Sequence, residues 1–315
     1  MKSSTWQSID IRWLAVAVSL LISAFLIVVH GTPNDDAFVY IRAAEIYTEQ
    51  GLAAAFAHFK WATYPVLIGI VYQVTGLDLI ASAYLLNGFL FALLVFAFLS
   101  IVREFDPSSR LMALAAACVL LYPQLNEYRH EIIRDIGFWA FSLLGIWKFL
   151  QFYQTLNLRN GVAFVAALIA AATFRAEAIV YLALLPLCLI SRSQFNAAQR
   201  VRMALGYTGT TLAALLVAVG IFYLSGINLI AMFTEFFSVY LPFIQDTFYP
   251  DEQRSLQIGR AVFNEHAAYY SSEYLALFMT FGLLAILIPN IFNAVGGPFL
   301  IALLLGWFKK QLVLT

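Results

Sequence analysis

The sequence predicts an all-α, polytopic membrane protein that crosses the bilayer about nine times. Of its 315 residues, 62% are apolar or aromatic and only 11% are charged, whereas about a quarter of a soluble domain is charged. Eighteen basic and 18 acidic residues cancel, so the net charge gives no reason to expect a nucleic-acid partner. Cys118 and Cys188 both lie in apolar runs, which excludes a small disulfide-linked scaffold.

The predicted spans are apolar runs, because a helix needs about 20 mostly apolar residues to cross the hydrocarbon core. The first covers 11–30 and follows Lys2. Since no small-residue cleavage site comes after it, we expect a retained helix rather than a signal peptide. Further apolar runs lie in two regions, a core region over 79–224 and a C-terminal region over 274–308. The runs cover 79–102, 111–124, 136–152, 161–174, 176–191, 203–224, 274–289 and 291–308. We expect the whole chain, 1–315, to form a single integral membrane domain.

The segment 63–76 is short for a span and contains Pro65 and Gln73. Lys and Arg are enriched in cytoplasmic loops, and this enrichment holds along the chain only if 63–76 stays on the outer side. The basic residues that then lie inside are Lys2, Arg12, Arg103, Arg110, Lys148, Arg159, Arg192, Arg200 and Arg202. We therefore expect 31–78 to form a long outer loop with interfacial helices, one of them over 36–50.

A second outer loop is expected at 225–273, where aromatic residues are dense. Its polar side chains could line a substrate entrance, although an aromatic belt at the membrane interface is the ordinary alternative. These side chains are Tyr249, Asp251, Arg254, Arg260 and His266. The last run would exit on the outer side with Lys309 and Lys310, against the charge rule. Either the final two runs form a re-entrant hairpin around Pro289 and 296–298, or further spans lie outside this chain.

The first candidate functional residues are Asp35 and Asp36, directly after the first span. Ionisable groups at a membrane are costly, and for that reason they are functional candidates. Adjacent carboxylates suit a general base or a pair of oxygen ligands for a divalent ion. Helix capping is the alternative, because Asn34, Asp35 and Asp36 precede a helical pattern.

A second group of candidates lies between two expected spans and comprises Glu127, Arg129, His130, Glu131, Arg134 and Asp135. On a continuous helix, the three acidic residues would be four positions apart and would share one face. Three acids, two arginines and a histidine at one membrane boundary indicate a site. A solvated loop held by helical ion pairs is the alternative.

A third candidate is the pair Arg175 and Glu177, which interrupts an apolar run over 161–190. An arginine at that depth needs an anionic partner, which could be Glu177, a distant aspartate or a phosphate. A purely structural ion pair is the alternative. The sequence carries no glycine-rich phosphate loop and no hydrolase motif. No zinc site is predicted from its scattered histidines, His30, His58, His130 and His266.

Four short motifs resemble those of GT-C type membrane glycosyltransferases, which include the polyprenyl-phosphate-sugar-dependent mannosyl- and arabinosyltransferases. In chain order they are Asp35-Asp36 with the helical pattern that follows, Tyr64-Pro65, the segment 123–135, and Thr173-Phe174-Arg175-Ala176-Glu177-Ala178. The last is similar to the family's Leu-Thr-Arg-x-Glu-Ala element, from which Phe174 departs. The resemblance covers roughly 10–190, and a typical member of the family is longer than this chain.

The resemblance implies a GT-C-like bundle and an enzyme that moves a sugar from a polyprenyl-phosphate donor to an acceptor hydroxyl, with inversion. It implies Asp35 or Asp36 as the general base. It implies a second acidic residue among Glu127, Glu131 and Asp135. The candidates for binding the donor phosphate are Arg175, Arg129 and Arg134. The supporting side chains are Tyr40, Tyr64, His130, Glu177 and His266.

No cofactor is required by this resemblance, and a divalent metal held by Asp36 and Asp135 is optional. The implied partners are the lipid-linked sugar donor, a lipid, glycan or protein acceptor, and the bilayer. The implied location is the bacterial inner membrane, with the site facing the periplasm and serving cell-envelope polysaccharide synthesis. The alternatives are a lipid-linked sugar flippase or transporter, and a non-catalytic subunit of a polysaccharide assembly complex. A transporter is favoured by internal repeats, which the sequence lacks.

Overall fold

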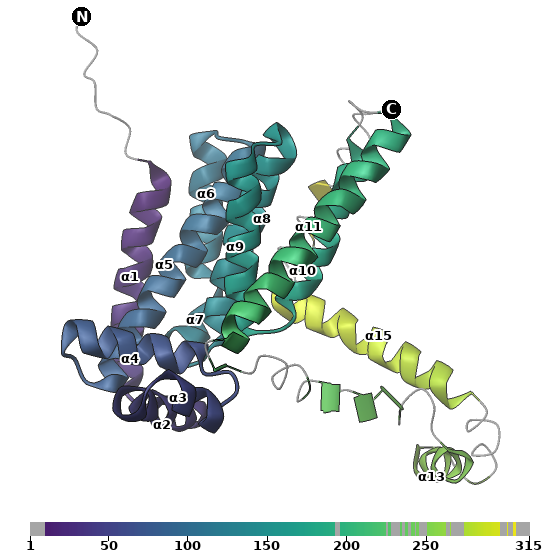
Figure 1. The fold of residues 1–315 in the computed structure, drawn as a ribbon, viewed down its shortest axis with the longest axis horizontal. Coiled ribbons are helices and arrows are strands. Elements are labelled where there is room, and N and C mark those ends of the chain that lie inside the picture. The colour runs from purple at the N-terminus through teal and green to yellow at the C-terminus, as the bar shows by residue number, and fades with distance from the viewer. Residues whose placement is uncertain are drawn as a thin grey trace, which may run out of the picture. The chain divides into compact units, whose positions relative to one another are not determined.

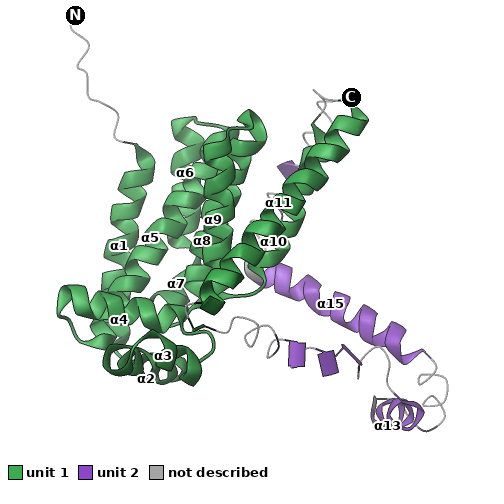
Figure 2. Cartoon of the chain, viewed as in Figure 1, with its two compact units in different colours: residues 1–233 green, residues 234–315 purple. Residues whose placement is uncertain are grey.

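The computed structural model is built from helices, and the residues that it describes contain no strand (Figure 1). The described residues are 10–192, 196–224, 226–227, 234, 237–238, 241–242, 244–245, 251–262, 265, 274–296, 301 and 305–306. The chain divides into two compact units, Met1–Phe233 and Thr234–Thr315 (Figure 2).

The first unit contains a bundle of helices that run side by side and a group of shorter helices that lie across one end of it (Figure 1). The bundle includes α1 (Ile11–His30), α5 (Leu79–Phe105), α6 (Ser109–Leu121), α8 (Asp135–Thr155) and α9 (Leu158–Phe174). The crossing helices are α2 (Asp35–Gln50), α3 (Leu52–His58) and α4 (Thr63–Thr75). The remaining elements are α7 (Pro123–Glu127), η1 (Tyr128–His130), α10 (Ala178–Leu184), η2 (Leu185–Ser191) and α11 (Ala197–Leu224).

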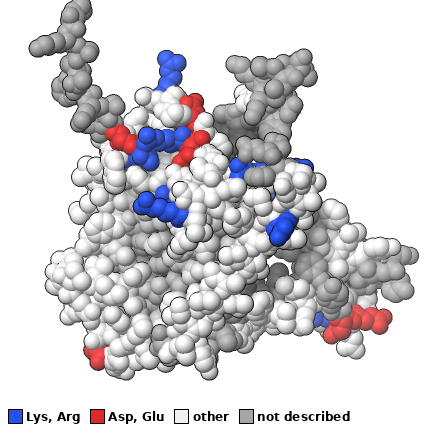
Figure 3. All heavy atoms as spheres, turned by 45° about the horizontal axis from the view of Figure 1, so that its top comes forward, with Lys and Arg blue, Asp and Glu red and all other residues white. Residues whose placement is uncertain are grey.

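The two ends of this bundle differ in chemistry. The loop end carries α2 to α4 together with the segments 122–134 and 175–177. The basic end is the end at which α1 begins, and Figure 3 shows Lys and Arg side chains gathered there. The basic residues at or near this end are Arg12, Arg103, Arg110, Lys148, Arg159, Arg192, Arg200 and Arg202. Because Lys and Arg are enriched in cytoplasmic loops, the predicted orientation has the basic end inside.

Glycine determines how closely α8 and α9 approach each other. A Cβ atom at Gly137 would lie 2.2 Å from the ring of Phe174, and one at Gly145 would lie 2.7 Å from the side chain of Leu168. Real Cβ atoms do not approach so closely, so these positions require glycine for the observed packing. The close contact fixes the end of α9, and therefore Arg175, beside the beginning of α8.

Four helices of the described residues are long and apolar enough to cross a membrane: α1, α5, α11 and the part of α15 (Leu275–Val295) over Leu275–Asn293. The chain is thus an all-helical protein with the character of an integral membrane protein. The expected spans between 111 and 191 correspond to helices that are shorter, as in α6 and α9, or less apolar, as in α8. The expected span 291–308 lies mostly outside the described residues. A total of nine spans stays a prediction.

The segment 63–76 forms α4, a helix of 13 residues. It lies across the end of the bundle beside α2, in close contact with it (Figure 1). A Cβ atom at Gly69 would lie 2.4 Å from the ring of Tyr47 on α2, so the two helices depend on glycine to pack. Gly76 then ends α4 with a φ of 70°, a left-handed conformation that suits glycine.

The second unit contains α13 (Glu252–Val262) and α15 among its described residues. The expected boundary between two spans near Pro289 is wrong, because α15 continues through Pro289 to Val295. A proline inside a helix removes a hydrogen-bond donor and clashes with the preceding turn, but it is tolerated in the apolar helices of membrane proteins, and the apolar run does not stop there. Gly296, with a φ of 78°, is the residue that ends the helix. The expected turn at 296–298 lies partly outside the described residues.

Candidate functional site

Three segments that are far apart in the sequence meet at the loop end. The side-chain oxygen of Asn34 accepts a hydrogen bond of 2.8 Å from the backbone nitrogen of Ile132. The hydroxyl of Tyr64 donates to the side-chain oxygen of Asn87 over 2.7 Å, and the amide nitrogen of Asn87 donates to the carbonyl oxygen of Glu131, also over 2.7 Å. These bonds join the first loop, α4 and α5 to the segment between α7 and α8.

An ion cluster of Asp135, Arg175 and Glu177 lies at this end. Arg175 forms an ion pair with Asp135 at the start of α8 and a second one with Glu177, in which the shortest distance is 2.8 Å. The side chains are about one quarter to two fifths exposed, at 24% for Asp135, 32% for Arg175 and 39% for Glu177. Arg175 therefore has both kinds of carboxylate partner that the sequence suggested, the near one and the distant one.

The contacts between Arg175 and Glu177 shift the pKa values of both side chains. Hydrogen bonds to Glu177 raise the pKa of Arg175, so the guanidinium stays protonated. Burial acts to raise the pKa of Glu177, but the hydrogen bonds and charge of Arg175, with the charge of Arg134, outweigh it and lower the pKa. Glu177 is therefore an anion at neutral pH, and it lies within the electrostatic range of Arg134.

Tyr40 connects α2 to this cluster. Its side chain is buried, and burial is the main cause of the raised pKa of its phenol. The charge and backbone N–H of Arg134 oppose that rise, while the charges of Asp36 and Asp135 add to it. The charges that act on the Tyr40 phenol are therefore those of Asp36 in α2, of Arg134 before α8 and of Asp135, the first residue of α8.

Arg134 has no ion pair with a carboxylate among the described residues. Its guanidinium carbon lies 4.8 Å from the centre of the Trp61 ring, a cation–π contact. One terminal nitrogen, Nη1, is buried and has no hydrogen-bond partner in the described part of the chain. The side chain thus keeps donor capacity for an anion, in contrast to Arg175, whose donors are taken by Asp135 and Glu177.

Asp35 and Asp36 are the first two residues of α2, and both are exposed. If the segment only capped a helix, Asn34 would lie at the helix start, and it is the N-cap residue of α2 by position. Its side chain makes no capping hydrogen bond, because it bonds to the backbone of Ile132 instead. Among the described residues, neither carboxylate has a hydrogen bond or an ion pair. The charge of Asp36 adds to the rise in the pKa of Tyr40.

The expectation that Glu127, Glu131 and Asp135 share one helix face is wrong. Helix α7 ends at Glu127, η1 ends at His130, and Glu131 is extended, with φ −90° and ψ 140°. The backbone of Glu131 and Ile132 bonds to the side chains of Asn87 and Asn34 instead of continuing a helix. Of the three acids, only Asp135 belongs to the ion cluster.

Arg129 is fully buried and lies against α1. Its guanidinium donates to the side chain of Asn126, to the carbonyl and hydroxyl of Ser19, and to the hydroxyl of Ser23, over 2.7 to 3.0 Å. Its guanidinium carbon also lies 4.5 Å from the centre of the Phe91 ring. These contacts anchor the segment 126–130 to the bundle and use most of the donors of Arg129.

His130 stacks on His30, the last residue of α1, with ring centres 4.1 Å apart and planes at 16°. Burial and then the neighbouring His30 lower the pKa of His130, against the charges of Glu131 and Glu127. This pair is separate from the ion cluster. His266 and Tyr249 lie outside the described residues; Asp251, Arg254 and Arg260 are exposed in the second unit.

A groove of about 510 Å³ begins close to the ion cluster. It is lined by residues of α5, α7, η1, α8 and α10, with Tyr128, Trp139 and Tyr181 among them. Trp139 follows Asp135 by four positions and Tyr181 follows Glu177 by four, so each lies one helical turn from a member of the cluster. The groove is mostly apolar and has the size of a small-molecule site.

A metal was expected only as an option, held by Asp36 and Asp135. In the part of the chain that the structure describes, no group of three or more His, Cys, Asp and Glu side chains could hold a metal ion. The carboxylate of Asp135 is already paired with Arg175. These two aspartates therefore fit a divalent ion poorly.

Most polar residues of the loop end were candidates in the sequence analysis. Trp61 was not among them, and Asn34 was expected only as part of a helix cap. Trp61 stacks on Arg134, and Asn34 holds the first loop to Ile132. Asn87 could have been found from its sequence context, because a lone amide inside an apolar span needs a buried partner.

Comparison with known proteins gives no match to a family model, to a curated protein or to a solved structure.

Proposed function

We propose that this chain is a membrane glycosyltransferase of the GT-C type, which moves a sugar from a polyprenyl-phosphate donor to an acceptor hydroxyl. The proposal includes a bundle of about nine spans, a bacterial inner-membrane location, and a loop end that faces the periplasm. The observation that carries it is the hydrogen bond that holds the start of α2, with Asp36, to the segment that carries Arg134, together with an ion cluster and an apolar groove.

Asp36 is the proposed general base. It lies at the exposed start of α2 without a cationic partner among the described residues, so its oxygens are free to accept a proton. The carboxylate takes the proton of the acceptor hydroxyl as that oxygen attacks the anomeric carbon. The bond from the anomeric carbon to the phosphate oxygen breaks, and polyprenyl phosphate leaves with the bonding electrons. One displacement inverts the anomeric configuration.

Arg134 is the proposed cation for the departing phosphate. Negative charge develops on that phosphate in the transition state, and a preorganised donor there lowers the barrier. Arg134 has a buried nitrogen without a partner among the described residues and is held on Trp61. Arg175 is less suited because carboxylates already occupy its donors, and Arg129 is less suited because its side chain is fully buried, against Ser19 and Ser23 of α1.

Asp135 is the proposed second acidic residue, acting as a positioning residue. Its pairing with Arg175 fixes the first turn of α8, directly after Arg134. Glu127 and Glu131 are not part of this arrangement. The isoprenoid chain of the donor would occupy the groove lined by Trp139 and Tyr181, with its phosphate toward Arg134.

The test is sugar transfer by the purified chain in proteoliposomes, with a panel of radiolabelled polyprenyl-phosphate sugars. We expect transfer from one donor class, and an Arg134→Gln variant should raise the KM for that donor about tenfold or more, because a charge-assisted hydrogen bond is lost. Arg110→Gln, at the basic end, is the matched control and should leave the KM unchanged. Translocation of the donor without transfer would instead identify a flippase and contradict the proposal.

A further inference from the structure

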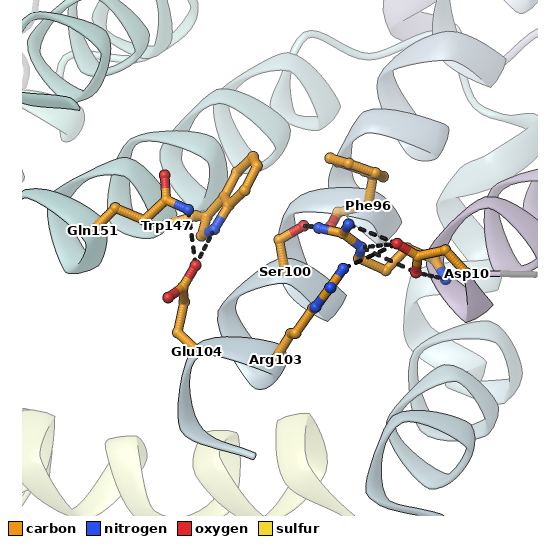
Figure 4. Close-up of polar contacts among 8 residues, drawn as sticks. Asp10, Phe96, Ser100, Arg103, Glu104, Trp147 and Gln151 are labelled. Carbon is orange, nitrogen blue, oxygen red and sulfur yellow. Dashed lines mark hydrogen bonds and ion pairs between the residues drawn. The ribbon is translucent and has the colours of Figure 1, made fainter. Parts of the chain in front are cut away.

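A second cavity lies at the basic end of the bundle, at the opposite end from the ion cluster, and its lining is polar. It has a volume of about 470 Å³ and is lined by residues of α1, α5 and α8, together with Pro107. The polar side chains that line it are Arg12, Arg103, Glu104, Trp147 and Gln151. Figure 4 shows Glu104 with Trp147 and Gln151 in one group, and Arg103 beside Asp10 in another. Nothing in the proposed transfer reaction uses this cavity.

One wall of the cavity is cationic and held in place. Asp10 accepts hydrogen bonds from the guanidinium of Arg12 over 2.6 Å and from that of Arg103 over 3.0 Å. The hydrogen bonds from Arg12 lower the pKa of Asp10 to about 2, so this carboxylate is always charged at neutral pH. Asp10 does not itself line the cavity, which means that it orients both arginines from behind.

Arg12 is further restrained by Ser100 and Phe96. It donates to the hydroxyl of Ser100 over 3.0 Å, and its guanidinium carbon lies 4.9 Å from the centre of the Phe96 ring. Its side chain is only 15% exposed, whereas that of Arg103 is 48% exposed. The wall therefore combines one fixed guanidinium with one that reaches toward the surface.

The facing wall presents a carboxylate with one oxygen engaged. Oε1 of Glu104 accepts from the indole nitrogen of Trp147 over 2.9 Å and from the amide of Gln151 over 2.8 Å. Within the described residues, its other oxygen has no hydrogen bond. The ammonium of Lys148 lies 3.6 Å from the centre of the Trp147 ring and balances the charge of Glu104. The two arginines exceed the charge of Asp10 by one, so the cavity favours a monoanion.

We infer that this cavity binds the phosphodiester headgroup of an anionic phospholipid from the leaflet at the basic end. A phosphodiester carries one negative charge, which matches the excess charge of Arg12 and Arg103 over Asp10. Hydroxyl groups of a glycerol head can donate to the free oxygen of Glu104, which a choline head cannot do. Basic pockets between membrane helices on the cytoplasmic side are suited to such headgroups.

The inference does not depend on the glycosyltransferase proposal, because it concerns other residues at the other end of the bundle. The same phosphate chemistry could come from free inorganic phosphate. A lipid is favoured by the position of the cavity at the end of apolar helices α1 and α5, where a headgroup lies at the membrane surface and its acyl chains lie along the helices.

The test measures phosphatidylglycerol binding to the full chain in detergent micelles, by native mass spectrometry and by the shift in unfolding temperature. Arg103→Gln should weaken phosphatidylglycerol binding about fivefold, as expected for one cation near the membrane surface. Arg110→Gln, which removes an arginine of α6 that does not line the cavity, should leave it unchanged. Unfolding without lipid shows whether each variant is folded.

Phosphatidylcholine should bind more weakly than phosphatidylglycerol, and millimolar inorganic phosphate should not displace the lipid. Equal losses in Arg103→Gln and Arg110→Gln would mean that only surface charge attracts the lipid, and would overturn the inference. Equal binding of the two lipids would also overturn it. Displacement by inorganic phosphate would assign the cavity to free phosphate and remove the lipid from the account.

Discussion

The side-chain amide of Asn34 pairs with the backbone of Ile132, 98 residues further along the chain. The amide oxygen accepts from the backbone nitrogen over 2.8 Å, and the amide nitrogen is directed at the carbonyl oxygen over 3.5 Å. Asn34 directly precedes Asp35 and Asp36, and Ile132 directly precedes the turn that carries Arg134. This one side chain therefore sets the spacing between the proposed base and the proposed phosphate-binding arginine.

Asn34→Ala should release the first outer loop from the segment before α8. The loss of a buried hydrogen-bonded contact should cost about 1–2 kcal/mol of stability, and the misplacement of Asp36 should also reduce transfer. Thermal unfolding in detergent measures the first effect, and Thr32→Ala, which removes an exposed hydroxyl, is the control. An unchanged unfolding temperature in Asn34→Ala would mean that the contact does not hold the loop.

Arg129→Leu should destabilise the protein by about 2–4 kcal/mol, because the hydroxyls of Ser19 and Ser23 would be left buried without a partner. Arg42→Leu, which removes an exposed arginine paired with Glu45 on α2, should change stability by less than about 0.5 kcal/mol. Unfolding temperatures compare the two. A stable Arg129→Leu protein with a raised KM for the donor would assign Arg129 to phosphate binding instead of anchoring.

Acid should weaken the ion cluster through Glu177. Its pKa is lower in the folded protein than its ordinary value of 4.5, so the pairing stabilises the fold above that value and is lost as the pH falls through the lowered pKa. The unfolding temperature of the wild type should therefore drop between about pH 5 and 3 by more than that of Glu177→Gln. Glu45→Gln, in an exposed pair, should retain the full drop.

The stacked pair His30 and His130 should add a second acid sensitivity at higher pH. The lowered pKa of His130 means that the folded state resists protonation, so stability is present above the ordinary value of 6.5 and declines as the pH falls below it. The groups that face this ring are His30, Glu127 and Glu131. His130→Gln should reduce the decline between about pH 7 and 5, whereas a matching change at exposed His58 should not.

The sequence was sufficient to predict the class of protein and the segments that carry its polar residues. Apolar runs give helices reliably because backbone groups in a membrane must be satisfied within the helix. They do not fix where one helix ends, and α15 passes Pro289 because proline is tolerated inside the apolar helices of membrane proteins. The number of spans depends on helix length and bilayer thickness together, and stays a prediction.

The partners of individual side chains were less accessible to sequence reasoning. Arg175 was expected to need an anionic partner, either a carboxylate or a phosphate, since an isolated cation at that depth is costly, and it has Asp135 and Glu177. The different surroundings of Arg134 and Arg129 could not be foreseen from the sequence. They follow from the break in helical structure at Glu131, which depends on side chains from α5 and from the first loop. Long-range hydrogen bonds of this kind leave no periodic signal in the sequence.

The central claim is that Asp36 acts as the base in sugar transfer, and the most direct measurement compares Asp36→Asn with Asp35→Asn. Both residues are exposed in the first turn of α2, so the two changes are matched in position and in chemistry. With a polyprenyl-phosphate sugar donor, Asp36→Asn should lower kcat by about 100-fold or more at unchanged protein level. Asp35→Asn should retain most of the activity. Equal activity of Asp36→Asn and the wild type would contradict the account.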